Sequence, residues 1–195
     1  HTYTTDELAK NKQIIIQLFY KNVKGKKADT SQANSKHDGS GGHWLETAMG
    51  VRHNGDNAPD LLGFEMKNHT TNKTTFGDWS GEYKIFGSRR RGKDITQDEF
   101  VRIFGSPNLE KEGRYSWSGS VVPKIRGFNF AGQKLTVDDD GIRAIYCYSE
   151  DTRKDKDSVV PIKYRVDDLV LESWSKSFIK QRLNKFENGW FKVIA

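Results

Sequence analysis

The sequence contains one cysteine, four prolines and no long apolar run. Cys147 on its own excludes an internal disulfide and any zinc site built from several cysteines. The longest apolar stretch is Ile14-Ile15-Ile16, far short of the roughly 20 residues that a membrane-spanning helix needs. A secretory signal pattern is also missing from the start of the sequence. We therefore expect a protein of the reducing cytoplasm that has no membrane partner.

The composition of the chain indicates a folded, moderately basic protein. Its 195 residues suit one domain, and an aromatic content of 12% supplies enough apolar surface for a core. The formal net charge of +6 is compatible with a nucleic-acid partner, and a solvated basic surface is the alternative. We expect a single domain over residues 1–195.

The patterning predicts helices and strands in mixed order. Thr4 and Glu7 have the spacing of a capping box, which predicts a helix over residues 4–22. A long polar loop, a short helix over 42–50 and a hairpin over 58–69 follow, with Leu62-Gly63 as its turn. The later segments predict an antiparallel meander with strands over 125–130, 134–137 and 142–148 and a turn at 138–141. A helix from Asp167 or Asp168 to 186 and a last strand over 190–195 follow. This order predicts a mixed α/β or α+β fold with a largely central sheet.

Three polar residues around the predicted turn form the most informative pattern. A two-residue turn at 62–63 would place Asp60 directly opposite Glu65, with Cβ atoms about 5 Å apart on one face. Two carboxylates that close repel each other unless a cation lies between them, and Mg²⁺ takes one or two carboxylates while it binds phosphate. Lys67 shares the face of Glu65, because side chains alternate along a strand. An ammonium group there can position a water or stabilise developing charge, so the pattern predicts a site for phosphodiester hydrolysis.

The same residues also fit a hairpin whose polar face is merely solvated. The apolar residues Leu61, Phe64 and Met66 favour the site, because they give the hairpin one consistent buried face. Glu46, on the expected upstream helix, is a further carboxylate that can complete a metal shell. An ordinary solvated helix residue is the alternative for Glu46.

The order of these motifs resembles a known nuclease family. A basic, Gly-rich loop containing Lys36 precedes Gly42-His43-Trp44-Leu45-Glu46, which is followed by Ala58-Pro59-Asp60 and then by Glu65-Met66-Lys67-Asn68-His69. This arrangement resembles the MvaI/BcnI group of type II restriction endonucleases. That group belongs to the PD-(D/E)xK nuclease superfamily and is related to the mismatch-repair nickase MutH.

The resemblance implies a fold, a cofactor and roles for particular residues. It implies a restriction-endonuclease-like core with a central mixed sheet flanked by helices. It makes Asp60 and Glu65 metal ligands and Lys67 the catalytic lysine, and it places Glu46 at an upstream acidic position that serves both the metal and catalysis. The implied cofactor is Mg²⁺, for which Mn²⁺ can substitute.

Several basic residues are candidates for binding DNA. Arg89-Arg90-Arg91 and Lys93 form a basic cluster beside glycines that can grip phosphates or enter a groove, and a solvated loop is the alternative. Lys36 lies in the polar loop that can close over a duplex, and a disordered surface loop is the alternative. His69 matches a family histidine whose role the resemblance leaves open, and we group it with these candidates.

We therefore expect a Mg²⁺-dependent endonuclease that cuts double-stranded DNA at a short specific site. The resemblance further implies a monomer of the bacterial cytoplasm that cuts the two strands in turn at a CC…GG type of sequence. Members of the MvaI/BcnI group continue past the strand matching residues 190–195 with a segment that reads the major groove. The sequence does not contain this segment, so we expect either that it is a fragment or that its recognition elements lie elsewhere. The alternatives are a MutH-like nickase that depends on a partner protein and a catalytically inactive DNA-binding module.

Overall fold

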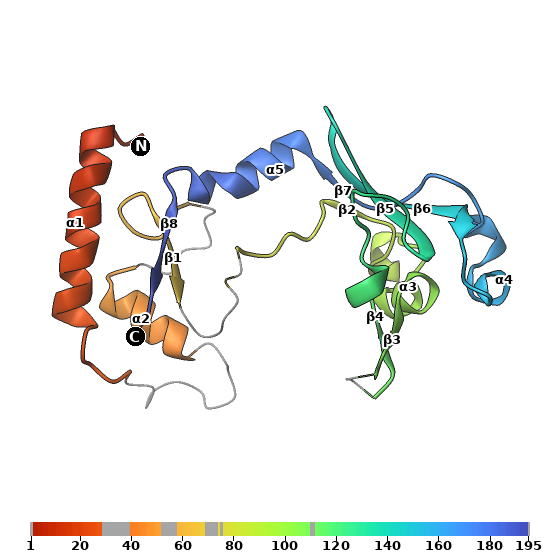
Figure 1. Ribbon diagram of the computed structural model, residues 1–195, viewed down its shortest axis with the longest axis horizontal. Helices are drawn as coiled ribbons and strands as arrows, with labels where there is room; N and C mark the ends of the chain where they lie inside the picture. Colours follow the sequence, from red (N-terminus) through yellow and green to blue (C-terminus); the bar gives the residue numbers. More distant parts are fainter. Residues whose placement is uncertain are drawn as a thin grey trace. The chain divides into compact units, whose positions relative to one another are not determined.

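The computed structural model describes residues 2–28, 40–51, 58–68, 74, 76–109 and 112–194. The chain forms two compact units, His1–Asp78 with Lys180–Ala195, and Trp79–Ile179. We call them the terminal unit and the inserted unit, since the second interrupts the sequence of the first, and Figure 1 labels the elements of both. The expectation of one nuclease domain over residues 1–195 stays a prediction.

Helix α1 (Thr5–Asn22) opens the terminal unit as the capping box predicts. Thr4 Oγ1 accepts a hydrogen bond from Glu7 N at 3.2 Å, and Glu7 Oε2 accepts one from Thr4 N at 2.7 Å. Ile15 is buried, and the predicted apolar face packs around it through Leu8, Leu18 and Phe19.

Helix α2 (Ser40–Ala48) packs against the same core and begins two residues before its predicted start. Leu45 and Met49 are fully buried, and Asn22 Nδ2 donates to the carbonyl of Ala48 at 2.9 Å. The core of the terminal unit therefore joins both helices to strand residues further along the chain: Ile15, Val23, Leu45, Met49, Phe64, Met66 and Val193.

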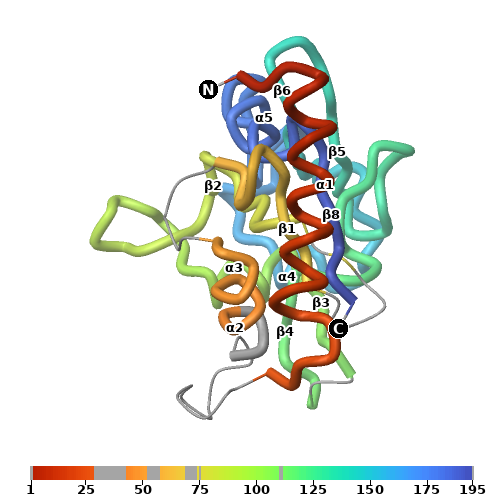
Figure 2. The backbone as a smooth tube through the Cα atoms, turned by 90° about the vertical axis from the view of Figure 1, so that its left-hand side faces the viewer, coloured from red at the N-terminus to blue at the C-terminus, as the bar shows by residue number. Residues whose placement is uncertain are grey.

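The predicted turn at Leu62-Gly63 is confirmed. Leu61 and Phe64 exchange both backbone hydrogen bonds, at 3.0 and 2.9 Å, and both central residues have positive φ, 49° and 88°. The hairpin predicted around this turn is nevertheless wrong beyond that one bridge. Strand β1 (Glu65–Asn68) pairs in parallel with strand β8 (Trp190–Val193), and the two lie side by side in Figures 1 and 2.

The inserted unit is built on a four-stranded antiparallel sheet. Its strand order is β2 (Tyr83–Lys84), β7 (Leu169–Ser175), β6 (Gly141–Asp151) and β5 (Ala131–Asp138). The predicted turn between the last two strands is confirmed, because Asp138 and Gly141 form the closing pair. A separate hairpin joins β3 (Ser106–Asn108) to β4 (Arg114–Ser116).

Helix α3 (Gln97–Phe104) supplies much of the core of the inserted unit. Its Phe100, Ile103 and Phe104 are buried against Tyr146 and Leu171 of the sheet. Shorter elements complete the unit: the 3-10 turns η1 (Arg89–Arg91), η3 (Gly119–Val121) and η4 (Ile162–Tyr164), and helix α4 (Lys156–Val159).

Two predicted elements are wrong. Residues 125–130 form a turn rather than a strand, with one isolated bridge between Lys124 and Gly127. The helix expected from 167 to 186 is strand β7 in its first half, and only α5 (Lys176–Leu183) and the 3-10 turn η5 (Asn184–Phe186) are helical. Asp167 does not cap a helix, because its carboxylate accepts hydrogen bonds from Ser149 N and Ser149 Oγ at 3.0 and 2.9 Å.

The molecule thus has the mixed α+β class that the sequence predicts. The parallel pair β1–β8 belongs to the terminal unit, and the antiparallel sheet belongs to the inserted unit. None of the helices within the described residues has the length and apolar character needed to cross a membrane.

Candidate active site

Strand β1 places Glu65 and Lys67 on the same face. Met66, between them, points to the core of the terminal unit and is 7% exposed. Lys67 Nζ donates to Glu65 Oε1 at 2.6 Å, and Glu65 is itself only 3% exposed. The predicted pair of a carboxylate and a lysine therefore forms a buried, charge-assisted contact.

Asp60 reaches the same place from the other side of the turn. Its Oδ2 accepts a hydrogen bond from Met66 N at 2.9 Å. In a regular hairpin, a backbone carbonyl of the partner strand would accept this bond. This side-chain bond explains why no regular hairpin continues past the turn. Burial raises the pKa of Asp60 above its ordinary value, the bond from Met66 N opposes that shift, and the negative charge of Glu65 adds to it.

The turn that joins these two carboxylates is anchored by side chains from elsewhere in the terminal unit. Asn11 Nδ2 of α1 donates to the carbonyl of Leu62, and Asn188 Nδ2 donates to that of Gly63, both at 3.1 Å. A Cβ on Gly63 would lie 2.7 Å from Tyr3 Cε2, so this position has no room for a side chain. The spacing between Asp60 and Glu65 is therefore fixed by the fold.

Lys185 is a second lysine at the site, and sequence reasoning did not find it. Its Nζ lies 3.2 Å from Glu65 Oε1, and its side chain is 22% exposed. It lies in η5, just before β8, far from Glu65 along the chain, so only the parallel pairing of β1 with β8 brings the two together. The same pairing sets Lys192 beside Lys67 on the face of Glu65.

Two aromatic rings lie near the ammonium group of Lys67. Its Nζ lies 5.6 Å from the ring centre of Phe186 and 6.0 Å from that of Phe76. Phe76 in turn makes edge-to-face contacts with Phe186 and with Trp190, at 5.4 and 5.0 Å between ring centres. The rings stabilise the cation through their faces and keep the lysine in place.

The carboxylate pair has the character of a divalent-cation site. Glu65 Oε2 is buried and has no hydrogen-bond partner among the described residues, although a buried carboxylate oxygen normally has one. Asp60 and Glu65 are like charges in contact, which a cation would relieve. In the described part of the chain no three His, Cys, Asp or Glu side chains form a metal cluster. Two carboxylates suffice for Mg²⁺, which keeps waters and takes further oxygens from a phosphate.

The remaining predicted catalytic residue, Glu46, lies on α2. Its Oε2 is 3.8 Å from His43 Nδ1, and its side chain is 37% exposed. The described residues do not join it to Asp60 and Glu65 in one cluster, and its role stays a prediction. Lys36 and His69 lie outside the described residues.

The predicted basic cluster lies in the inserted unit and divides into two kinds of residue. Arg89 forms an ion pair with Glu99, the capping-box residue of α3. Lys93 donates to the carbonyl of Lys84 and lies 4.6 Å from the ring centre of Tyr83. Their neighbours Arg90 and Arg91 are exposed on the same 3-10 turn and form no ion pair within the part of the chain that the structure describes.

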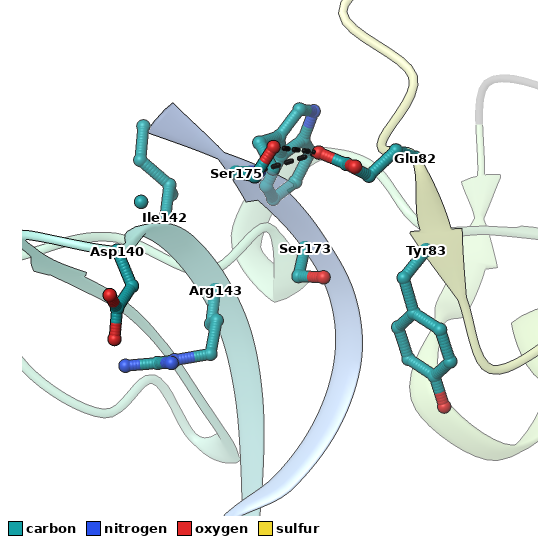
Figure 3. Close-up of a pocket in the computed structure, with 9 residues that line it drawn as sticks. Glu82, Tyr83, Asp140, Ile142, Arg143, Ser173 and Ser175 are labelled. Atoms are coloured by element: carbon teal, nitrogen blue, oxygen red, sulfur yellow. Dashed lines mark hydrogen bonds between the residues drawn. The ribbon is translucent and has the colours of Figure 1, made fainter. Parts of the chain in front are cut away.

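A surface pocket of 260 Å³ in the inserted unit is also lined by polar residues (Figure 3). Ser175 donates to Glu82 Oε2 through both its N and its Oγ, and these bonds lower the pKa of Glu82. The bonds between Glu82 and Ser175 tie the residue before β2 to β7, and Arg143 is held by Asp138 outside the pocket lining.

Two carboxylates and a lysine at the start of a strand, in a mixed α+β protein, are the chemical set of a hydrolytic nuclease. Comparison with known proteins agrees with that class. The family described as LlaMI restriction endonuclease matches residues 23–193. The type II restriction enzyme ScrFI of Lactococcus lactis subsp. cremoris is 42% identical over 205 aligned positions, which cover 93% of this chain and 74% of the relative. No solved structure matches.

The chain belongs to the LlaMI restriction endonuclease family. This membership confirms the type II restriction endonuclease identity that the motif order predicts, and it makes the protein a site-specific deoxyribonuclease with DNA as its substrate.

Proposed function

We propose that the protein hydrolyses phosphodiester bonds of double-stranded DNA at a short specific site and that it needs Mg²⁺ for this reaction. The observation that carries the proposal is the contact of Asp60 with the buried Glu65, whose carboxylate has one oxygen without a partner among the described residues and has Lys67 at 2.6 Å from the other. Mn²⁺ can replace Mg²⁺ in this proposal, since both take oxygen ligands.

In this proposal each residue of the site has its own task. Asp60 and Glu65 hold the divalent ion, which when bound activates water and neutralises charge on the phosphate. Lys67 keeps its ammonium beside Glu65, where it can orient the attacking water and stabilise the charge that develops on the phosphate oxygens. The rings of Phe76 and Phe186 lie within 6.0 Å of this ammonium and favour its charged form through their faces.

The remaining roles rest on the resemblance to the MvaI/BcnI group. Glu46 assists the ion or its hydrogen-bond network. Lys36, His69 and the basic cluster at 89–93 contact DNA. By the same resemblance the protein is a monomer of the bacterial cytoplasm that cuts the two strands in turn at a CC…GG type of sequence.

Supercoiled plasmid carrying many sequence contexts tests the proposal directly. The protein is incubated with plasmid in Mg²⁺, in Mn²⁺ and in EDTA, beside Lys67→Met and beside Lys10→Met as a control on the exposed face of α1. The proposal predicts discrete linear fragments that need the divalent ion and Lys67 but not Lys10, and sequencing of their ends gives the site.

Other outcomes would separate the alternatives. Open circles without linear product would favour a nickase that acts with a partner protein. Salt-dependent DNA binding without turnover in any divalent ion would favour an inactive binding module. Cleavage that persists in EDTA would contradict the metal-dependent mechanism.

A further inference from the structure

Glu65 has an unequal environment at its two carboxylate oxygens. Oε1 has two ammonium groups within ion-pair distance, Lys67 at 2.6 Å and Lys185 at 3.2 Å. Oε2 is buried without a partner among the described residues. Two ammonium groups therefore contact Oε1 and, within the same part of the chain, none contacts Oε2. Their two positive charges exceed the single negative charge of the Glu65 carboxylate.

The neighbouring carboxylate of Asp60 offsets the second of the two ammonium groups on Glu65. Asp60 and Glu65 carry two negative charges when ionised, and Lys67 and Lys185 carry two positive charges. A divalent ion beside the two carboxylates would add two positive charges where two ammonium groups already contact Glu65 and where the pairing of β1 with β8 sets Lys192 on the same face. Because like charges at such distances repel strongly in a partly buried site, an ammonium has to withdraw from Glu65 when the ion binds.

The geometry indicates which ammonium withdraws. Lys67 stands on strand β1 and forms the shorter contact with Glu65, 2.6 Å. Both ammonium groups lie over the ring of Phe186, at 5.6 Å for Lys67 and 5.2 Å for Lys185, so this ring does not distinguish them. Lys185 stands on the 3-10 turn η5, forms the longer contact and has the more exposed side chain, 22% against 16%. Lys185 can therefore swing to solvent at lower cost than Lys67.

We propose that Lys185 is a positioning residue that neutralises the carboxylate pair before metal binding and competes with the divalent ion for Glu65. This inference rests on the proposed function, because it assumes that Asp60 and Glu65 hold the ion. Lys185 thereby lowers the affinity of the DNA-free protein for the divalent ion. It also keeps the carboxylate pair ordered when no ion is bound.

Mn²⁺ binding to the DNA-free protein, followed by electron paramagnetic resonance, tests the competition without any cleavage. Lys185→Met removes the charge and keeps the length of the side chain, whereas Lys185→Arg keeps the charge. The matched control is Lys10→Met on α1, which lowers the net charge of the same unit equally. We expect Lys185→Met to bind Mn²⁺ about tenfold more tightly than the wild type, and both Lys185→Arg and Lys10→Met to bind like the wild type. Unchanged or weaker binding in Lys185→Met would overturn the inference, including the case in which neither protein binds Mn²⁺.

Two further measurements separate the possible failures. Asp60→Asn should abolish the Mn²⁺ signal, and a signal that persists in Asp60→Asn would contradict the proposed site itself rather than the role of Lys185. The rise in melting temperature on adding Mn²⁺ should be larger in Lys185→Met than in the wild type, since tighter binding to the native state stabilises it more. Should Lys185→Met fail to fold, Lys185→Gln decides the question by the same two readouts.

Discussion

Two arginines of the basic cluster, Arg90 and Arg91, allow a quantitative prediction about DNA binding. Arg90 and Arg91 are exposed without an ion pair in the described residues, whereas Arg89 is paired with Glu99. Each phosphate that a cation neutralises adds about 0.9 to the slope of log affinity against log salt. The double variant Arg90→Ala/Arg91→Ala should therefore lower that slope by about 1.8. Between about 50 and 200 mM salt, a fourfold change, the wild type should then lose about tenfold more affinity than the variant.

Fluorescence anisotropy of a labelled duplex, with Ca²⁺ in place of Mg²⁺ to prevent cleavage, measures this slope. Arg89→Ala is the matched comparison: because Glu99 already holds its guanidinium, we expect its removal to lower the slope by less than the removal of Arg90 and Arg91 does. An unchanged slope in the double variant, or an equal fall in Arg89→Ala, would refute the division of the cluster into free and paired residues.

Further predictions concern stability and the lysine beside the site. Asp151→Asn should lower the free energy of unfolding by about 3 kcal/mol in urea, because it breaks a buried pair with Arg153 (2.7 Å). Burial acts to raise the pKa of Asp151, but hydrogen bonds from Arg153 outweigh burial and the pKa is lowered. The pair therefore stabilises the wild type above the ordinary aspartate pKa, and this stability is lost as the pH falls through the lowered pKa. An acid titration of unfolding should show that loss in the wild type and not in the variant. Gly63→Ala should cost about 1–3 kcal/mol by thermal melting, since φ is 88° and Tyr3 is 2.7 Å from the new Cβ, and a stability equal to the wild type would show that the turn adapts. Lys192→Met should weaken DNA binding and reduce the salt slope by about 0.9, because Lys192 lies beside Lys67, whose partner Glu65 is already contacted by two lysines, so a DNA phosphate would offset the added charge. An unchanged slope would remove Lys192 from the interface.

The parts of the fold that sequence could predict are those fixed by neighbouring residues. The Thr4–Glu7 capping box sets the start of α1 by bonds within four residues. The turn at Leu62-Gly63 depends on local backbone preference, and it brought Asp60 and Glu65 together as the pattern predicts. The core of the candidate site was therefore predictable, because it is built around one turn.

The parts that sequence could not predict depend on distant partners. Strand β7 has helical spacing of its apolar residues, yet it pairs on both sides with β2 and β6, and such tertiary pairing outweighs local propensity. The Asp60 side chain accepts the hydrogen bond from Met66 N that a backbone carbonyl would accept in a regular hairpin. The alternation of apolar and polar residues does not predict such a side-chain bond. Lys185 joins the site only because β8 returns beside β1.

The central claim is that Asp60, Glu65 and Lys67 form one metal-dependent hydrolytic site. Single-turnover cleavage of a duplex containing the mapped site, measured across Mg²⁺ concentrations for the wild type and Lys67→Met, tests it most directly. We predict that Lys67→Met remains folded, binds the duplex in Ca²⁺ like the wild type, and cleaves about a thousandfold more slowly at saturating Mg²⁺. A cleavage rate for Lys67→Met within about tenfold of the wild type would contradict the account.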